Sequence, residues 1–314
     1  MIILCKKSLA HQTHTEIVLI FGIGLIGLEI VNALTKTGYS PFTHDFSWTD
    51  RQQQASDASS IIDKLRTLSH DPMTGTGHGR EPAIDVVWAA GKCGFVSSCE
   101  ELEEEKKSFQ RILELHGEIS SSGLCNSARF HLVSSAGGLF ESQKLINETS
   151  TPSPCRPYGN QKLQLEQLLL DTVDNRICFI YRPSSVYGFM NSGRFGFIST
   201  LLKNGLLNKE VNILGSMNTL RDYVFSADIG QHIANRITSN NTSGSIEMLA
   251  SGKPTSILQL KLIVEQIINK KIYICCSSSK ANHEDITFDV NGLPVDWQPT
   301  EINLGIRKIY NDFF

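Results

Sequence analysis

The chain has 314 residues, which at about 150 residues per domain predicts roughly two domains. Hydrophobic residues make up 40% of it and charged residues 19%, a composition that is typical of a folded protein and excludes a disordered one. Lysine and arginine total 29 against 32 acidic residues, so the net charge is −3. This balance, without a basic block, excludes nucleic acid as the main partner.

We expect no membrane partner, because no apolar stretch approaches the ~20 residues that span a bilayer. The first residues have too short an apolar run for a secretory signal. None of the eight cysteines forms a C-x-x-C pair or a zinc-spaced group, so we expect reduced thiols, a cytoplasmic protein and no metal site. His11 and His14 form a close pair, which we interpret as part of a solvated leader and not as metal ligands.

Short apolar runs alternate with helical patterns in the first half of the chain, which predicts parallel βαβ units. The expected strands cover residues 16–21, 42–45, 83–90, 130–135 and 177–181. The expected helices cover residues 25–37, 98–116, which opens on a capping box, and 158–173. We therefore predict an α/β fold with a doubly wound parallel sheet in residues 1–182. A smaller mixed substrate domain is expected in residues 183–314, with some segments returning to the first domain.

A glycine-rich turn follows the first expected strand and opens the first expected helix. It reads Gly22-x-Gly24-x-x-Gly27, with Leu25 and Ile26 inside it. Glycine lets the chain turn tightly, lets a pyrophosphate approach the helix N-terminus and lets the helix pack close to the sheet. The bare motif is weak evidence, but its strand–turn–helix context predicts a dinucleotide site at these residues. The alternative is a glycine turn without a ligand.

Asp45 lies 18 residues after Gly27, at the end of the second expected strand. A carboxylate there would accept hydrogen bonds from the ribose hydroxyls of NAD and repel the extra phosphate of NADP. The position therefore favours NAD over NADP as the cofactor. The alternative is an aspartate that only starts a loop.

A second group of residues has the chemistry of a proton-transfer site. Tyr158 and Lys162, four residues apart at the start of a helix, would share one helix face, after a strand that ends in Ser134 and Ser135. A free phenol has a pKa of about 10, but a neighbouring ammonium and a positive nicotinamide ring would lower it. Tyr158 could then take a proton from a substrate hydroxyl that Ser135 holds, while hydride leaves the same carbon. The alternatives are a half-buried aromatic, a surface cation and a strand-end hydroxyl.

Together these motifs resemble the extended short-chain dehydrogenases/reductases of the NAD-dependent epimerase/dehydratase type, which have a Rossmann fold and act mostly on nucleotide sugars. The resemblance runs from about residue 16 to the C-terminus, and its matching stretches are residues 22–27, 85–91, 132–135, 157–162, 182–188 and 220–224. It implies that further cofactor-lining residues are Ala89, Ala90, Gly91, Ser134, Pro183, Ser184 and Ser185. Ser135 is favoured over Ser134 as the substrate-facing hydroxyl.

On the substrate side, the resemblance implies that Arg221 binds the diphosphate through its guanidinium fork, with Asn191 and Arg194 as weaker candidates. The alternative for Arg221 is a surface pair with a neighbouring acid. Homodimerisation is expected through a four-helix bundle built from helices at 100–116 and 158–172. The family's third strand is not recognisable between residues 50 and 80, which leaves the adenine contacts open.

We therefore expect an NAD-dependent epimerase or ketoreductase that acts on a nucleotide sugar. Dehydration is disfavoured, because Ala136 and Gly137 cannot do acid–base work. Two alternatives stay open, a dehydrogenase or reductase of a non-nucleotide carbonyl and a non-catalytic dinucleotide-binding regulator. The sequence does not identify the sugar, which depends on the shape of the pocket in the C-terminal part.

Overall fold

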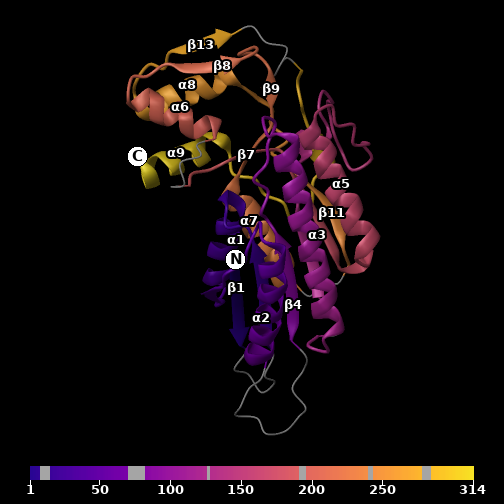
Figure 1. The fold of residues 1–314 in the computed structure, drawn as a ribbon. Coiled ribbons are helices and arrows are strands. Elements are labelled where there is room, and N and C mark those ends of the chain that lie inside the picture. Colours follow the sequence, from indigo (N-terminus) through magenta and orange to yellow (C-terminus); the bar gives the residue numbers. More distant parts are fainter. Residues whose placement is uncertain (8–14, 70–81, 126–127, 191–195, 240–242, 278–283) are drawn as a thin grey trace.

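A seven-stranded sheet with the strand order β11-β6-β5-β4-β2-β1-β3 forms the centre of the molecule (Figure 1). The computed structural model describes residues 1–7, 15–69, 82–125, 128–190, 196–239, 243–277 and 284–314. The strands are β1 (Ile2–Lys7), β2 (Thr15–Phe21), β3 (Ser40–Thr43), β4 (Ala83–Trp88), β5 (Ala128–Val133), β6 (Cys178–Pro183) and β11 (Ser245–Leu249). All neighbouring pairs from β11 to β2 are parallel.

Helices cover both faces of this sheet, which confirms the doubly wound fold. On one face α2 (Arg51–Ser69), α3 (Cys99–Ser121) and α5 (Pro157–Thr172) share a hydrophobic cluster with the strands. On the other face α1 (Leu25–Lys36) packs against α7 (Ser226–Thr238). Alternate residues of β2 enter the two clusters, because successive side chains of a strand point to opposite faces. The capping box that Ser98 and Glu101 predict is present at the start of α3.

The sequence did not predict β1, which lies between β2 and β3 and is antiparallel to both. Ile2 pairs with Ile20 on one side and with Thr43 on the other. We expected no strand before residue 16, because the apolar run at the start of the chain is short. The sequence also missed α2, whose buried apolar stripe is limited to a few residues, Ala58, Ile61 and Leu65 among them.

A smaller lobe with its own hydrophobic cluster lies beyond one end of the sheet (Figure 1). It contains α6 (Phe197–Leu206), α8 (Ile257–Ile268), α9 (Ile302–Phe313) and the parallel pair of β8 (Val211–Leu214) with β13 (Ile274–Ser277). The chain returns from this part to the large sheet through α7 and β11. The domain boundary after residue 182 stays a prediction.

The structure has further short elements. They are α4 (Ala136–Leu139), β7 (Ser185–Tyr187) paired with β10 (Tyr223–Phe225), β9 (Leu220–Arg221) paired with β12 (Thr255–Ser256), and the 3-10 turns Asn175–Ile177 and Val290–Gly292. The eight cysteines all lie within the described residues, and none of them forms a disulfide there. Among the helices described, none is both long and apolar enough to cross a membrane.

Candidate active site

At two positions of the turn between β2 and α1, no residue larger than glycine fits. Gly22 has a φ of +93°, and a Cβ there would lie 2.2 Å from the Cα of Ala90. A Cβ on Gly27 would lie 1.9 Å from the carbonyl oxygen of Gly22. Gly24, by contrast, has no neighbouring atom within 4 Å of its Cβ position. The turn is therefore closed on its inner side, towards the sheet, and open at Gly24.

The N-terminus of α1 is free to meet an anion. Gly24 is its N-cap and forms no side-chain capping bond, and the first turn of the helix has no acidic residue. The first N–H groups of a helix lack partners within the helix and carry a partial positive charge. This arrangement fits a pyrophosphate lying over Gly24.

A cavity of about 680 Å³ extends from this turn into the smaller lobe. Its volume is in the range usual for cofactor and ligand pockets. The predicted residues that line it are Gly24, Leu25, Ile26, Ala89, Gly91, Ser134, Ser135, Tyr158, Lys162, Pro183, Ser184, Ser185 and Arg221. Most of them follow the carboxyl ends of parallel strands, the usual place for a ligand in an open α/β sheet.

Four predicted residues stand apart from this lining. Gly22, Gly27 and Ala90 form the packed turn behind it. Asp45 is exposed beyond the end of β3, and β1 separates that strand from β2. The inserted strand thus moves Asp45 one strand spacing, about 4.8 Å, further from Gly22 than a direct pairing of β2 with β3 would. Its contact with ribose stays a prediction. Asn191 and Arg194, like His11 and His14, lie outside the described residues.

Tyr158 and Lys162 share one face of α5, as their spacing predicts. The Nζ of Lys162 lies 5.5 Å from the centroid of the Tyr158 ring. The other side of the tyrosine meets the edge of Phe95, with ring centroids 5.1 Å apart. Gly138 leaves the ring its space, because a Cβ there would lie 3.0 Å from Tyr158 Cε1. The phenol ring therefore lies between α4 and the loop after β4, and Tyr158 lines the cavity.

The two serines after β5 differ in their hydrogen bonds. The Oγ of Ser135 accepts from the backbone N–H of Gly138 at 3.2 Å and caps α4. The Oγ of Ser134 is buried and has no hydrogen-bond partner among the described residues. Both side chains line the cavity. Ser134 therefore presents an unused hydroxyl to a ligand, although the sequence favoured Ser135 for the substrate.

Sequence reasoning missed Glu105, the buried partner of Lys162. The lysine Nζ lies 2.9 Å from Glu105 Oε1, and the two side chains are 3% and 4% exposed. The other carboxylate oxygen accepts the backbone N–H groups of Lys92 and Cys93, each at 2.9 Å. Glu105 lies within the acidic run 100–105, which resembled a solvated helix face, and nothing in that run marks it as buried. One carboxylate thus joins α3, α5 and the loop after β4.

The charges in this pair stabilise each other. Burial opposes the charge on Lys162, but its attraction to Tyr158 and Glu105 outweighs burial and raises the pKa of the lysine. Burial likewise opposes the charge on Glu105, but Lys162 and the Cys93 amide lower the pKa of the carboxyl. Burial, with Glu105 beside it, raises the pKa of the Cys93 thiol to about 11, so this cysteine stays protonated at neutral pH.

Arg221 is not a surface partner of the neighbouring acid. Its Nη1 donates to the backbone carbonyls of Leu220, at 2.9 Å, and of Glu284. Burial lowers the pKa of the guanidinium. Asp222 is 1% exposed and accepts from Ser184 Oγ and Ser251 N, each at 2.7 Å. Arg221 thus lines the cavity without an ion pair to any carboxylate in the described ranges.

Comparison with known proteins gives matches consistent with this site. The NAD dependent epimerase/dehydratase family matches residues 18–246. The uncharacterized UDP-glucose epimerase YtcB of Bacillus subtilis (strain 168) is 24% identical over 193 residues, which are 58% of this chain and 56% of that protein. The chain thus matches little more than half the length of this curated relative.

Solved structures of similar fold extend over nearly the whole chain. A UDP-glucose 4-epimerase of Thermotoga maritima with UDP-glucose is 17% identical with a TM-score of 0.72, covering 94% of this chain and 97% of that one. A UDP-glucuronic acid 4-epimerase from Bacillus cereus, in complex with UDP-glucuronic acid and NAD, is 18% identical with a TM-score of 0.69, covering 94% and 98%. At such identities these likenesses show the fold.

The fold and the site define a dinucleotide-binding α/β protein with a Tyr–Lys pair beside the expected cofactor groove. More specifically, the family match spans most of the chain, and the protein belongs to the NAD dependent epimerase/dehydratase family.

Proposed function

We propose that the protein is an NAD-dependent epimerase that acts on a nucleotide sugar, with uridine diphosphate as the nucleotide. The observation that carries this proposal is a single cavity lined by the open helix N-terminus at Gly24, by Tyr158 and Lys162, and by Arg221. The names of similar structures support the ligand classes, since they hold UDP-glucose, UDP-glucuronic acid and NAD.

The cofactor part fits NAD in its own residues. Gly24 leaves the space that a pyrophosphate would fill, and the α1 N-terminus supplies unpaired N–H groups. Pro183, Ser184 and Ser185 would flank the nicotinamide end, close to Tyr158. Bound NAD would supply reversible hydride acceptance. The contact of Asp45 with the ribose belongs to this proposal and determines the preference over NADP.

Tyr158 would exchange a proton with a sugar hydroxyl. Its phenol faces the cavity, and the Lys162 cation lies beside its ring. A hydroxyl of Ser134 or Ser135 would hold the reacting oxygen in place. Arg221 would donate to the diphosphate, because buried N–H groups of a guanidinium match phosphate oxygens. An epimerase returns the hydride to the opposite face of the sugar, so the reaction shows no net redox change.

The direct test follows sugar interconversion. Purified protein with NAD receives UDP-glucose or UDP-glucuronic acid, and chromatography detects the epimer. Tyr158→Phe is expected to reduce kcat at least about 10²-fold, because it removes the proton-transferring hydroxyl. The matched control is Tyr273→Phe, whose ring is 65% exposed and lies outside the cavity lining. Full activity in Tyr158→Phe would reject the mechanism.

The same assay distinguishes the two other functions. Stoichiometric NADH absorbance with a non-nucleotide alcohol or carbonyl would support a net dehydrogenase or reductase. NAD binding with no turnover on any nucleotide sugar would support a dinucleotide-binding regulator. Retained NAD in the purified protein, detected by mass spectrometry, would support the epimerase.

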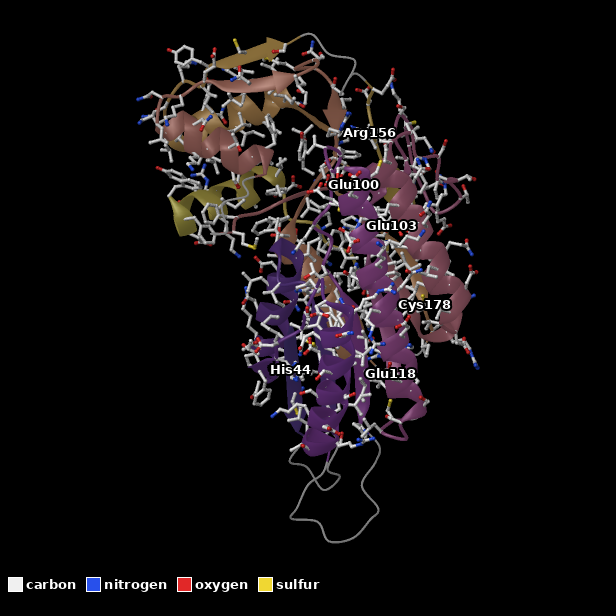
Figure 2. All side chains as sticks on the ribbon, in the orientation of Figure 1. His44, Glu100, Glu103, Glu118, Arg156 and Cys178 are labelled. Atoms are coloured by element: carbon white, nitrogen blue, oxygen red, sulfur yellow. The ribbon has the colours of Figure 1, made fainter. Side chains whose placement is uncertain are left out.

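A homodimer built through α3 and α5 also stays a proposal. Most exposed side chains on these helices are charged or amides, among them Glu103 and Glu118 on α3 (Figure 2) and Gln164 and Gln167 on α5. A four-helix bundle formed there would therefore have a polar interface. Light scattering of the purified protein measures the oligomeric state.

A further inference from the structure

A side pocket of about 40 Å³ adjoins the active-site cavity on the side of Tyr158. Phe95, Gly137, Ser184, Ser185 and Arg221 line both spaces. The side pocket is completed by residues that do not line the main cavity, Arg156, Asp222, Ile286 and Phe288. A single water needs about 10–15 Å³, so this space admits one small chemical group and excludes a second sugar ring.

Arg156 is tied to the catalytic end of α5. It is the N-cap residue directly before Pro157 and Tyr158, at the end of α5 that lies nearest the smaller lobe (Figure 2). Its guanidinium carbon lies 3.8 Å from the centroid of Phe95, the ring whose edge meets Tyr158. Phe95 thus contacts both Arg156 and Tyr158 and connects the side pocket to the tyrosine.

The guanidinium of Arg156 is only partly used. Its Nε donates to Glu141 Oε2 at 2.6 Å. The two terminal nitrogens have no hydrogen-bond or ion-pair partner among the residues that the structure describes. The second oxygen of Glu141 is buried and does not line the pocket. The side pocket therefore receives unused N–H donors from Arg156.

The acidic residue on the wall is already saturated. Both oxygens of Asp222 accept hydrogen bonds, from Ser184 Oγ and from the backbone and hydroxyl of Ser251. Arg221 contributes a second guanidinium to the wall and donates to carbonyl oxygens only. Asp222, together with Glu141 outside the pocket, balances the two positive charges, but the terminal N–H groups of Arg156 have no acceptor in the pocket. A ligand group that is rich in acceptors fits this wall.

We propose that the side pocket binds a carboxylate of the sugar ring, so that the substrate is a nucleotide-linked uronic acid. The proposal rests on the proposed function, because it needs the sugar beside Tyr158. Two carboxylate oxygens match the paired N–H groups of a guanidinium, whereas a hydroxymethyl group offers a single oxygen. Arg156 then holds the acid in the side pocket, and Arg221, which also lines the main cavity, would donate to the diphosphate there.

The expected signature is a preference for the acid that depends on Arg156. Titration calorimetry of the NAD-loaded protein compares UDP, UDP-glucose and UDP-glucuronic acid. UDP-glucuronic acid is expected to bind at least about tenfold more tightly than UDP-glucose, as a charge-assisted bidentate contact would give. Arg156→Gln should remove this preference and leave the affinity for UDP unchanged, and Arg156→Lys should retain part of it.

Lys144→Gln is the matched control. Lys144 is a 60% exposed cation that pairs with Asp285 and lines neither pocket. This variant should keep the full preference for UDP-glucuronic acid, because it removes a positive charge that lies outside both pockets. An equal loss in Lys144→Gln and Arg156→Gln would overturn the proposal.

Two further outcomes separate the inference from the proposed function. If the wild-type protein binds UDP but has equal affinity for UDP-glucose and UDP-glucuronic acid, the side-pocket inference alone is overturned. Weaker binding of UDP itself in Arg156→Gln would assign Arg156 to the diphosphate and also overturn it. Failure of the wild-type protein to bind UDP at all contradicts the proposed function and removes the inference with it. The wild-type comparison tests the proposal even if an Arg156 variant does not fold.

Discussion

Lys162 reaches Glu105 at 2.9 Å, so the cation beside Tyr158 is already paired with a buried carboxylate. From the sequence we expected the ammonium of Lys162 to favour the phenolate form of Tyr158. In this structure Lys162 and Glu105 form an ion pair whose net charge next to the Tyr158 phenol is close to zero. Glu105 therefore opposes the effect of Lys162 on Tyr158, and it fixes the loop after β4 through Lys92 and Cys93.

Replacing Glu105 by Gln should move the pH dependence of the reaction. Without the negative charge of Glu105, burial opposes the charge on Lys162 with less to offset it, so the pKa of the lysine should fall and the alkaline limb of the kcat profile should move to lower pH. The variant should also unfold more easily by about 3 kcal/mol, because it leaves a buried cation without its partner. A kcat–pH profile and urea denaturation measure the two effects.

Glu104→Gln provides the control for this change. Glu104 is the preceding residue on α3, and its side chain is 60% exposed and paired with Lys107. The kcat–pH profile should not change in Glu104→Gln. The free energy of unfolding should change by no more than about 0.5 kcal/mol, as is usual for surface ion pairs. A Glu105→Gln variant that loses rate uniformly at every pH would assign Glu105 a structural role only.

Two glycines of the β2–α1 turn should respond differently to alanine. Gly24→Ala finds open space, so the protein should keep its Tm but lose the increase in Tm that NAD produces, because the methyl group would enter the pyrophosphate position. Gly27→Ala drives a Cβ into the Gly22 carbonyl and should lower the Tm of the protein without NAD. Differential scanning fluorimetry with and without NAD separates these outcomes. Unchanged NAD stabilisation in Gly24→Ala would contradict the placement of the pyrophosphate.

The sequence indicated most of the residues that line the cavity, but it did not indicate the strand order at the edge of the sheet. Gly24, Tyr158 and Lys162 were recognisable because strand–turn–helix context and helical spacing are local properties of the chain. The pairing of Glu105 with Lys162 joins residues 57 positions apart, and nothing in the acidic run around Glu105 indicates that it turns inward. The insertion of β1 between β2 and β3 is likewise determined by tertiary packing, since a strand of six residues with two lysines at its end does not specify its neighbours.

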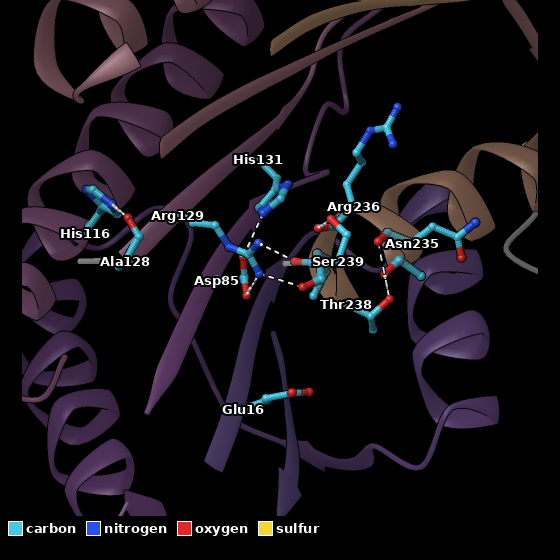
Figure 3. A network of polar contacts seen from close by, with 12 residues as sticks. Glu16, Asp85, His116, Ala128, Arg129, His131, Asn235, Arg236, Thr238 and Ser239 are labelled. Atoms are coloured by element: carbon cyan, nitrogen blue, oxygen red, sulfur yellow. Dashed lines mark hydrogen bonds and ion pairs between the residues drawn. The ribbon is translucent and has the colours of Figure 1, made fainter. Parts of the chain in front are cut away.

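A buried polar network crosses the sheet away from the active site and should make stability depend on pH (Figure 3). His131 is fully buried, with Nε2 2.8 Å from Asp85 Oδ1 and Nδ1 2.9 Å from the Tyr181 hydroxyl. Burial lowers the pKa of His131 despite the hydrogen bond to Asp85. The histidine is thus neutral in the folded protein and takes up a proton only on unfolding as pH falls below about 6.5.

The free energy of unfolding should therefore decrease as pH falls from 6.5 to 5, by at most about 1.4 kcal/mol per pH unit for this group. His131→Gln removes the titration while keeping donor and acceptor atoms, so its stability should be lower at pH 7 but depend less on pH. His116, whose pKa burial also lowers, retains part of the dependence in both proteins. Urea denaturation at several pH values measures the two slopes, and equal slopes would show that His131 does not control this pH response.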